Sequence, residues 1–274
     1  MTVTITRAVE IGARTVLCAS TGNTSASMAA YAAKAGLQAV VLVPKGKIAK
    51  AKLLQAIAYG AKITQVSGNF DEALRQARKI SQKRTDRYLV NSLNPYRIEG
   101  QKTLAFEIWE QLGRRLPDFL FVPVGNAGNI SAIWKGFIEL RAVGLVRRYP
   151  KMIGVQAAGA APIAAAYKDR SDSVTPWGKP RTLASAIRIG APASWKKALA
   201  AVKESQGAML AVSDDEILRA QRLLANHEGI FAEPASAASF AGLTKAHKAG
   251  LINESNIAVC VITGHGLKDQ KAIS

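Results

Sequence analysis

The chain has 274 residues and a mass of 29.1 kDa, which predicts one large domain or two modest ones. Hydrophobic residues make up 49% of the sequence, so a sizeable core can be buried and a disordered chain is excluded. The formal net charge is +18, from 37 basic and 19 acidic residues. A protein with this excess of positive charge can bind nucleic acid, an acidic membrane or small anions.

The basic residues are spread along the chain, and the densest stretches, 45–52 and 75–87, are typical of the polar sides of helices. The sequence has no zinc-finger, RNP or KH pattern, and no apolar run of the roughly 20 residues that span a bilayer. The first residues lack the apolar segment of a signal peptide, and two cysteines are too few for a disulfide framework or a Cys-rich zinc site. We expect a cytoplasmic protein that binds neither nucleic acid nor membranes.

Short β-branched runs alternate with amphipathic helical patterns along the chain. Strands are predicted at 15–19, 39–43, 62–66, 87–91, 119–122, 152–156, 209–212 and 257–262. Helices are predicted at 24–35, 48–59, 71–83, 99–112, 130–143, 213–227 and 235–249. The alternation predicts an α/β fold of βαβ units, with parallel sheets covered on both faces.

Three other features bear on the organisation of the chain. Residues 168–181 show little periodicity and are expected to form a loop, and a domain boundary is predicted within 105–117. The segment SDDEILRA is typical of a helix start, because Ser213 can act as N-cap and Glu216 follows three residues later. We therefore interpret Asp214 and Asp215 as structural.

Three turns rich in glycine and hydroxyl groups follow predicted strands, and ligands of parallel sheets bind at that end of the strands. The turn in CASTGNTSAS leads into a helix and could hold a carboxylate or phosphate, or act only as an N-cap. The turn in PVGNAGNISAIW matches neither the P-loop nor the dinucleotide pattern, and it could wrap one phosphate monoester or be a plain tight turn. The turn in VCVITGHGLKD carries the hydroxyl of Thr263 at the end of the strand. His265 in the same turn could be a catalytic base or a hydrogen-bonded loop residue.

Two further segments carry polar or small residues before helices. NSLNPYRIEGQKT contains Arg97, a side chain that could clamp a phosphate with two hydrogen bonds. EGIFAEPASAAS places Glu233, Pro234, Ala235 and Ser236 just before an Ala-rich helix, where small residues would let a flat ring pack closely. Ordinary helix capping is the alternative for both segments.

Taken together and in this order, the segments resemble the threonine synthases, which are pyridoxal-phosphate (PLP) enzymes of the tryptophan-synthase-β-like group. The resemblance runs from residue 2 to about residue 269, and AIRIGAPASW and TGHGLKD favour threonine synthases over the related serine and threonine dehydratases. It implies the fold type II architecture, with two three-layer α/β/α domains and mainly parallel sheets. Residues 1–105 would form the smaller domain and residues 106–274 the larger one.

The resemblance also implies roles for the matching residues. PLP is the implied cofactor, and its phosphate would be held by Gly125, Asn126, Ala127, Gly128 and Asn129. The phenolic oxygen of its ring would meet Asn23, and its pyridine nitrogen would meet Thr263, a neutral partner that leaves this nitrogen largely unprotonated. The implied substrate is O-phospho-L-homoserine, which reacts with water to give L-threonine and phosphate. Its carboxylate would face Ser20, Thr21 and Thr24. Its phosphate would be held by Asn91, Ser92 and Arg97, with Asn126 nearby. The family also suggests a homodimer.

One element of the family pattern is not found in the printed sequence. The family carries its Schiff-base lysine in a phrase like FKDRGM, ahead of the segment that matches MTVTITRAVEIGA, and no lysine here has a matching context. We therefore expect that the catalytic lysine and part of the larger domain are absent, that turnover is impaired, and that the reading frame starts at an internal Met or the chain is clipped. Another fold type II lyase, such as a dehydratase or a cysteate-synthase-like enzyme, and a non-catalytic relative without the lysine stay open as alternatives.

Overall fold

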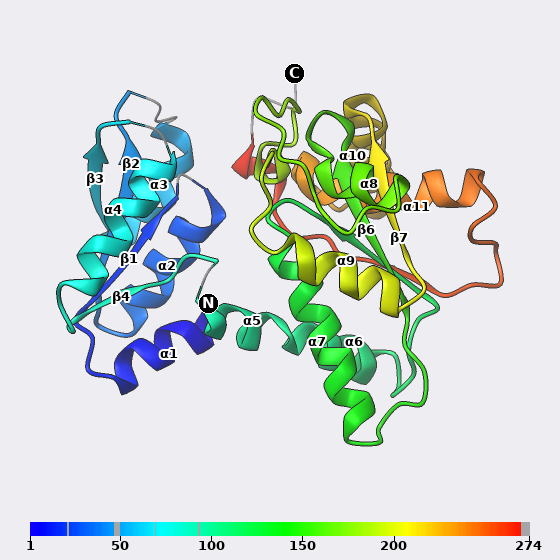
Figure 1. Cartoon of the computed structure of the whole chain (residues 1–274), viewed down its shortest axis with the longest axis horizontal. Helices are drawn as coiled ribbons and strands as arrows, with labels where there is room; N and C mark the ends of the chain where they lie inside the picture. The colour runs from blue at the N-terminus through cyan, green and yellow to red at the C-terminus, as the bar shows by residue number, and fades with distance from the viewer. Residues whose placement is uncertain (21, 47–49, 69, 93, 270–274) are drawn as a thin grey trace. The chain divides into compact units, whose positions relative to one another are not determined.

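The computed structural model describes residues 1–20, 22–46, 50–68, 70–92 and 94–269. The chain divides into two compact units, Met1–Gln101 and Lys102–Ser274, and each is built around its own parallel sheet (Figure 1). The boundary predicted between residues 105 and 106 falls inside helix α6 (Thr103–Gln111). Among the described helices, none is long and apolar enough to cross a membrane.

The first unit has a four-stranded sheet in the order β3-β2-β1-β4, with all neighbours parallel. Its strands are β1 (Thr15–Ala19), β2 (Gln38–Pro44), β3 (Lys62–Val66) and β4 (Arg87–Leu89). Its helices are α1 (Thr2–Glu10), α2 (Asn23–Lys34), α3 (Lys50–Ala58), α4 (Phe70–Gln82) and α5 (Pro95–Gln101).

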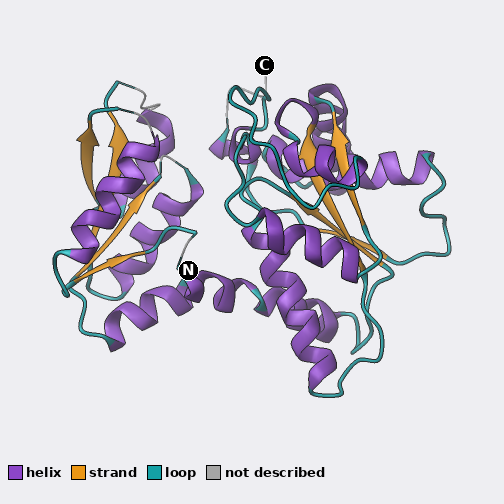
Figure 2. Ribbon diagram, viewed as in Figure 1, coloured by secondary structure: helices purple, strands orange, loops and turns teal. Residues whose placement is uncertain are grey.

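Strand β1 is buried along its whole length because helices cover both faces of the sheet. Its side chains alternate between the two faces, as a strand requires. Val16 and Cys18 pack into the cluster that contains Met28 of α2, whereas Leu17 packs into the one that contains Ala77 of α4. The layers of helix, strand and helix are visible in Figure 2.

The second unit repeats this plan with the strand order β7-β6-β5-β8, again parallel throughout. Its strands are β5 (Phe119–Pro123), β6 (Lys151–Ala157), β7 (Ala208–Val212) and β8 (Ala258–Cys260). Besides α6, its helices are α7 (Gly128–Ala142), α8 (Pro162–Lys168), α9 (Trp195–Glu204), α10 (Asp214–Glu228) and α11 (Pro234–Lys248). Short 3-10 turns lie at η1 (Ala158–Ala160), η2 (Ser185–Ile187) and η3 (Gly266–Lys268).

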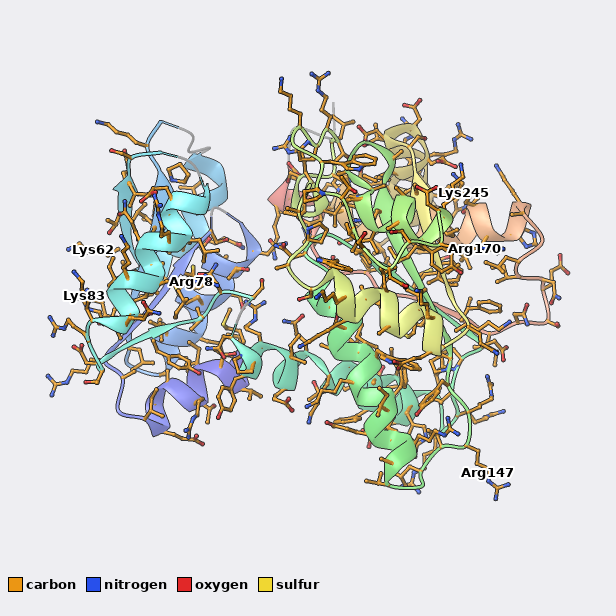
Figure 3. The ribbon with its side chains drawn as sticks, viewed as in Figure 1. Lys62, Arg78, Lys83, Arg147, Arg170 and Lys245 are labelled. Carbon is orange, nitrogen blue, oxygen red and sulfur yellow. The ribbon has the colours of Figure 1, made fainter. Side chains whose placement is uncertain are left out.

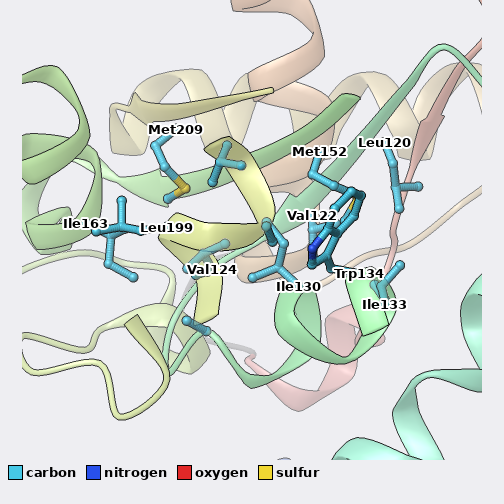
Figure 4. Close-up of a cluster of buried hydrophobic side chains, with 14 of the residues drawn as sticks. Leu120, Val122, Val124, Ile130, Ile133, Trp134, Met152, Ile163, Leu199 and Met209 are labelled. Atoms are coloured by element: carbon cyan, nitrogen blue, oxygen red, sulfur yellow. The ribbon is translucent and has the colours of Figure 1, made fainter. Parts of the chain in front are cut away.

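The core of the second unit lies on both faces of its sheet. On one face, Leu120 and Val122 of β5 pack with Ile130 and Ile133 of α7, as Figure 4 shows. On the other face, apolar residues of β5 and β6 pack against α10 and α11. Gly242 lets α11 lie directly on β6, because a Cβ at this position would collide with the side chain of Val155.

The eight predicted strands and the alternating α/β order are confirmed, and the capping box at Ser213 is present with both of its hydrogen bonds. The single helix predicted at 99–112 is wrong: α5 ends at Gln101 and α6 begins at Thr103, with the carbonyl of Lys102 facing Gly136 of α7. The start of the helix predicted at 48–59 lies partly outside the described residues. Helices α1, α8 and α9 were not expected.

Candidate functional site

The turn after β5 is shaped by close packing of its backbone. Val124 donates its N–H to the carbonyl of Val155 at 2.8 Å, which continues the β5–β6 ladder beyond the strand. Gly125 is buried, and a Cβ there would lie 3.1 Å from the carbonyl oxygen of Ala186 and from Cα of Ile187. These contacts are tighter than most Cβ contacts, so the close approach of the 3-10 turn η2 favours glycine at this position.

The same turn leads directly into the N-terminus of α7. Its N-cap residue, Ala127, has the left-handed φ of 64° and gives no side-chain hydrogen bond to the helix. The first backbone N–H groups of a helix have no partner within it, and they carry the positive end of the helix dipole. The first turn of α7 has no acidic residue, and a Cβ on Gly128 would meet no atom within 4 Å. This end of α7 can therefore accept a phosphate group.

Asn126 connects the turn to another segment of the second unit through two hydrogen bonds. Its backbone carbonyl accepts the N–H of Ser194 at 3.1 Å, and its side-chain oxygen accepts the N–H of Ala193 at 3.4 Å. These bonds join the turn to the segment that leads into α9. The segment APASW, which carries part of the family resemblance, thus supports the turn.

Thr263 lies three residues beyond the end of β8, and its side chain is exposed. Its Oγ1 is 2.7 Å from Oγ of Ser236, a fully buried residue in the first turn of α11. Strands β5 and β8 are parallel neighbours, so Thr263 and the turn at 125–129 lie at the same edge of this sheet. His265 makes a hydrogen bond within its loop, since its Nδ1 accepts the N–H of Leu267 at 3.2 Å.

In the first unit, the turn after β1 leads into α2. Ser20 accepts the N–H of Gly22 at 3.2 Å, and the N-cap Gly22 has no side chain to offer. The first turn of α2 has no acidic residue, Asn23 is exposed and Thr24 is half-buried. Thr21 lies outside the described residues. The described part of this turn also presents an acid-free helix N-terminus.

Strand β4, next to β1, brings a second segment to this edge. Asn91 is buried and binds the last residue of β1 twice, accepting the N–H of Ala19 and donating to its carbonyl, each at 2.9 Å. The side chain of Asn91 therefore closes the β1–β4 ladder, and Ser92 follows it. The described residues that the family resemblance assigns to the substrate therefore lie in segments that follow β1 and β4.

Arg97 in α5 is a half-buried cation. Its Nη1 donates to the carbonyl of Val90 at 3.2 Å, and its buried Nε has no hydrogen-bond partner among the described residues. Burial lowers the pKa of the guanidinium, and the nearby Cys18 opposes that shift. A phosphate supplied by a ligand would satisfy the open Nε.

Much of the remaining basic surplus lies on the surface. Lys62, Arg78, Lys83, Arg147, Arg170 and Lys245, which Figure 3 labels, are all exposed. The stretch 75–87 includes much of the exposed side of α4, as predicted, whereas much of 45–52 lies outside the residues whose side chains are described. A hollow in the second unit is lined by Tyr167, Lys168, Arg170 and Lys203, none of which the resemblance assigns to the site.

The comparisons with known proteins agree with this geometry. The family model described as pyridoxal-phosphate dependent enzyme matches residues 1–264. Proteins named threonine synthase are 54% identical over 272 residues in Methanocaldococcus jannaschii and 54% identical over 269 residues in Mycobacterium tuberculosis. The chain belongs to the threonine synthase family of PLP-dependent enzymes. The alignments cover 99% and 98% of the chain, and 67% and 72% of these two proteins.

Solved structures of other enzymes share the fold of this threonine synthase family member. A fungal L-serine ammonia-lyase from Rhizomucor miehei is similar with a TM-score of 0.79 and 22% identity, over 95% of this chain and 81% of that one. Maize serine racemase is similar with a TM-score of 0.77 and 20% identity, over 97% and 77%. These similarities confirm the predicted architecture of two parallel-sheet α/β units.

The residues present fit PLP as the family's cofactor. The acid-free N-terminus of α7 suits a phosphate dianion, and the open space at Gly128 leaves room for one. The contact between Thr263 and Ser236 was missed by the sequence analysis. Ser236 attracted attention only as a small residue, because nothing local in the sequence links it to a residue 27 positions away.

Proposed function

We propose that the protein acts as a threonine synthase, in which O-phospho-L-homoserine and water give L-threonine and phosphate. The observation that carries this proposal is the glycine turn at the acid-free N-terminus of α7, at the sheet edge that also presents Thr263. Relatives that are more than half identical and named threonine synthase support the reaction. Phosphate-bearing reactants also suit a chain of net charge +18.

Two parts of the second unit would hold PLP. The turn of Gly125, Asn126, Ala127, Gly128 and Asn129 would bind the phosphate through the N–H groups at the start of α7. The hydroxyl of Thr263 would bond to the ring nitrogen as a neutral partner. From the first unit, Asn23 at the start of α2 would bond to the phenolic oxygen.

PLP supplies an electron-withdrawing ring that stabilises negative charge on the carbon atoms of a bound amino acid. The protein's own part is binding and orientation. The positive end of the α7 dipole would stabilise the negative charge of the cofactor phosphate, and Thr263 would contact the ring as a neutral group. A neutral hydroxyl at this position suits elimination and addition better than transamination.

The substrate would be held at the β1–β4 edge of the first unit. Ser20, Thr21 and Thr24 would face its carboxylate at the start of α2, and Asn91, Ser92 and Arg97 its phosphate. Among the described residues, the buried Nε of Arg97 has no hydrogen-bond acceptor, and a phosphate oxygen would provide one. The bonds of Asn91 to Ala19 hold this segment in place.

We further propose a homodimer in the cytoplasm, with residues 1–105 as the smaller domain and residues 106–274 as the larger one. The family resemblance supports each of these statements.

The direct test uses the protein as its own gene expresses it, loaded with PLP and supplied with O-phospho-L-homoserine. If the expressed protein includes the Schiff-base lysine, we expect inorganic phosphate and L-threonine to appear in equal amounts. The printed chain, in which no lysine has the matching context, is expected to turn over poorly. Formation of a keto acid from L-threonine or L-serine, without use of the phosphorylated substrate, would assign the protein to the dehydratases instead. Binding of both phosphate compounds without any turnover would favour the non-catalytic relative.

A further inference from the structure

The hydroxyl of Ser236 lies at the centre of a hydrogen-bond network beyond the end of β8. Its Oγ accepts the N–H of Thr263 at 3.1 Å and the N–H of Gly264 at 2.6 Å. The same oxygen lies 2.7 Å from Oγ1 of Thr263 and 3.2 Å from the carbonyl oxygen of Gly264. Ser236 is 0% exposed, so water cannot replace any of these partners.

The number of lone pairs decides the direction of the bond between the two hydroxyls. A serine hydroxyl has two acceptor lone pairs and one proton. Both lone pairs of Ser236 are used by the two backbone N–H groups, so Ser236 cannot also accept the proton of Thr263. The Ser236 proton has two acceptors within reach, the Gly264 carbonyl at 3.2 Å and Oγ1 of Thr263 at 2.7 Å, and we assign it to Thr263 because that contact is the shorter one.

The proton of Thr263 is therefore left for a ligand. Among the described residues, Thr263 has no other hydrogen-bond acceptor, and its side chain is exposed at the edge of the sheet. We propose that Ser236 is a positioning residue, which fixes the Thr263 hydroxyl as a donor toward an unprotonated nitrogen of the cofactor ring. This inference rests on the proposed function, since the ring nitrogen is the acceptor that the function supplies.

A pair of ligands that differ only at the ring nitrogen tests the inference. Pyridoxine 5′-phosphate has the ring and phosphate but no aldehyde, so its binding needs no covalent bond, and its analogue carries C–H in place of the ring nitrogen. We expect the unaltered chain to bind the nitrogen compound roughly three- to tenfold more tightly, as one neutral hydrogen bond allows. In Ser236→Ala this ratio should fall toward one, because the Thr263 proton is no longer directed.

Ser239→Ala is the matched control. Ser239 is also fully buried in α11, and its hydroxyl donates to the carbonyls of Ser236 and Val261 but not to Thr263. This variant should lose comparable packing and keep the affinity ratio of the unaltered chain. Thr263→Val, which removes the hydroxyl itself, should give the same low ratio as Ser236→Ala.

The outcomes separate the two proposals. If the unaltered chain binds neither compound, the proposed cofactor site is wrong and the inference falls with it. If it prefers the nitrogen compound and Ser236→Ala keeps that preference, only the role of Ser236 is overturned. Should Ser236→Ala fail to fold, Ser236→Cys takes its place, since a thiol is a weak donor and acceptor: a ratio near one supports the role of Ser236, and the ratio of the unaltered chain overturns it.

Discussion

The guanidinium of Arg97 is a cation with unfilled capacity for hydrogen bonds to an anion. Its guanidinium is largely removed from solvent, which lowers its pKa, yet among the described residues it has only the carbonyl of Val90 as a hydrogen-bond acceptor. Removing a charge from solvent without an ion partner destabilises the folded protein. Binding of a substrate phosphate would offset this desolvation free energy.

We expect Arg97→Lys to raise the KM for O-phospho-L-homoserine by roughly ten- to a hundredfold, because lysine cannot make the two parallel bonds of a guanidinium. Arg78→Lys, an exposed change on α4, should leave KM unchanged. Steady-state kinetics with both variants are the measurement. An unchanged KM in Arg97→Lys would show that the substrate phosphate lies elsewhere.

For single residues, the sequence predicts which turns form the candidate site better than it predicts which side chains bond to one another. Turns that follow predicted strands could be assigned to the site, since ligands of parallel sheets bind at that edge. The bonds of Asn91 to Ala19 and of Ser236 to Thr263 join residues 72 and 27 positions apart, so they depend on strand order and helix docking. No local pattern reports such contacts.

The start of α7 is the element on which cofactor binding depends. We expect Gly128→Ala to leave the free energy of unfolding of the ligand-free chain within about 1 kcal/mol, because an added Cβ meets no neighbour. The same methyl group should weaken binding of pyridoxine 5′-phosphate by roughly tenfold or more, since it fills space before the N–H donors.

Gly178→Ala is the control for this variant, because a Cβ there also meets nothing within 4 Å and the residue lies in the loop at 168–181. Urea unfolding and equilibrium titration are compared for both variants. Equal affinities would place the cofactor phosphate away from α7.

The start of α10 should affect stability alone. Ser213 accepts the N–H of Glu216 at 3.1 Å, and the Glu216 carboxylate accepts the N–H of Ser213 at 2.6 Å. We expect Ser213→Ala to lower the free energy of unfolding by about 1 kcal/mol without changing ligand affinity. Urea unfolding and a ligand titration check both statements, and a change in affinity would contradict the structural interpretation.

Strands were predicted more reliably than helices because burial on both faces leaves a continuous β-branched run. The segment Thr2–Glu10 is also rich in Thr, Val and Ile, which favour strands, yet it forms α1. Its residues Thr4, Ile5 and Ala8 are buried along one side at helical spacing, so packing against α2 and α5 overrides the local preference.

At the scale of the whole molecule, folding and pH are linked through Cys18. Burial raises the pKa of this thiol from 9.0 to about 12, and the nearby Arg97 opposes the shift. The folded chain therefore holds the thiol proton in a pH range where the unfolded chain releases it. This contribution to stability is complete below about pH 9 and is lost as the pH rises toward 12.

We expect the free energy of unfolding to fall between pH 9 and pH 11, and to fall less steeply in Cys18→Ala. Urea unfolding at a series of pH values measures both slopes. Identical slopes in the two proteins would show that the thiol is not responsible. In the folded chain at pH 8, thiol reagents should react with Cys18 only after unfolding, because the residue is 0% exposed.

We propose that the turn at 125–129 and Thr263 of the second unit bind the cofactor, and that Asn23 of the first unit bonds to the phenolic oxygen of its ring. Backbone NMR of the ¹⁵N-labelled chain tests it as pyridoxine 5′-phosphate is added. We predict saturable shifts of the amides of Gly125, Ala127, Gly128 and Thr263 in the second unit and of Asn23 in the first. Saturation without shifts at these amides, or shifts confined to surfaces such as the hollow at Tyr167 and Lys203, would contradict the account.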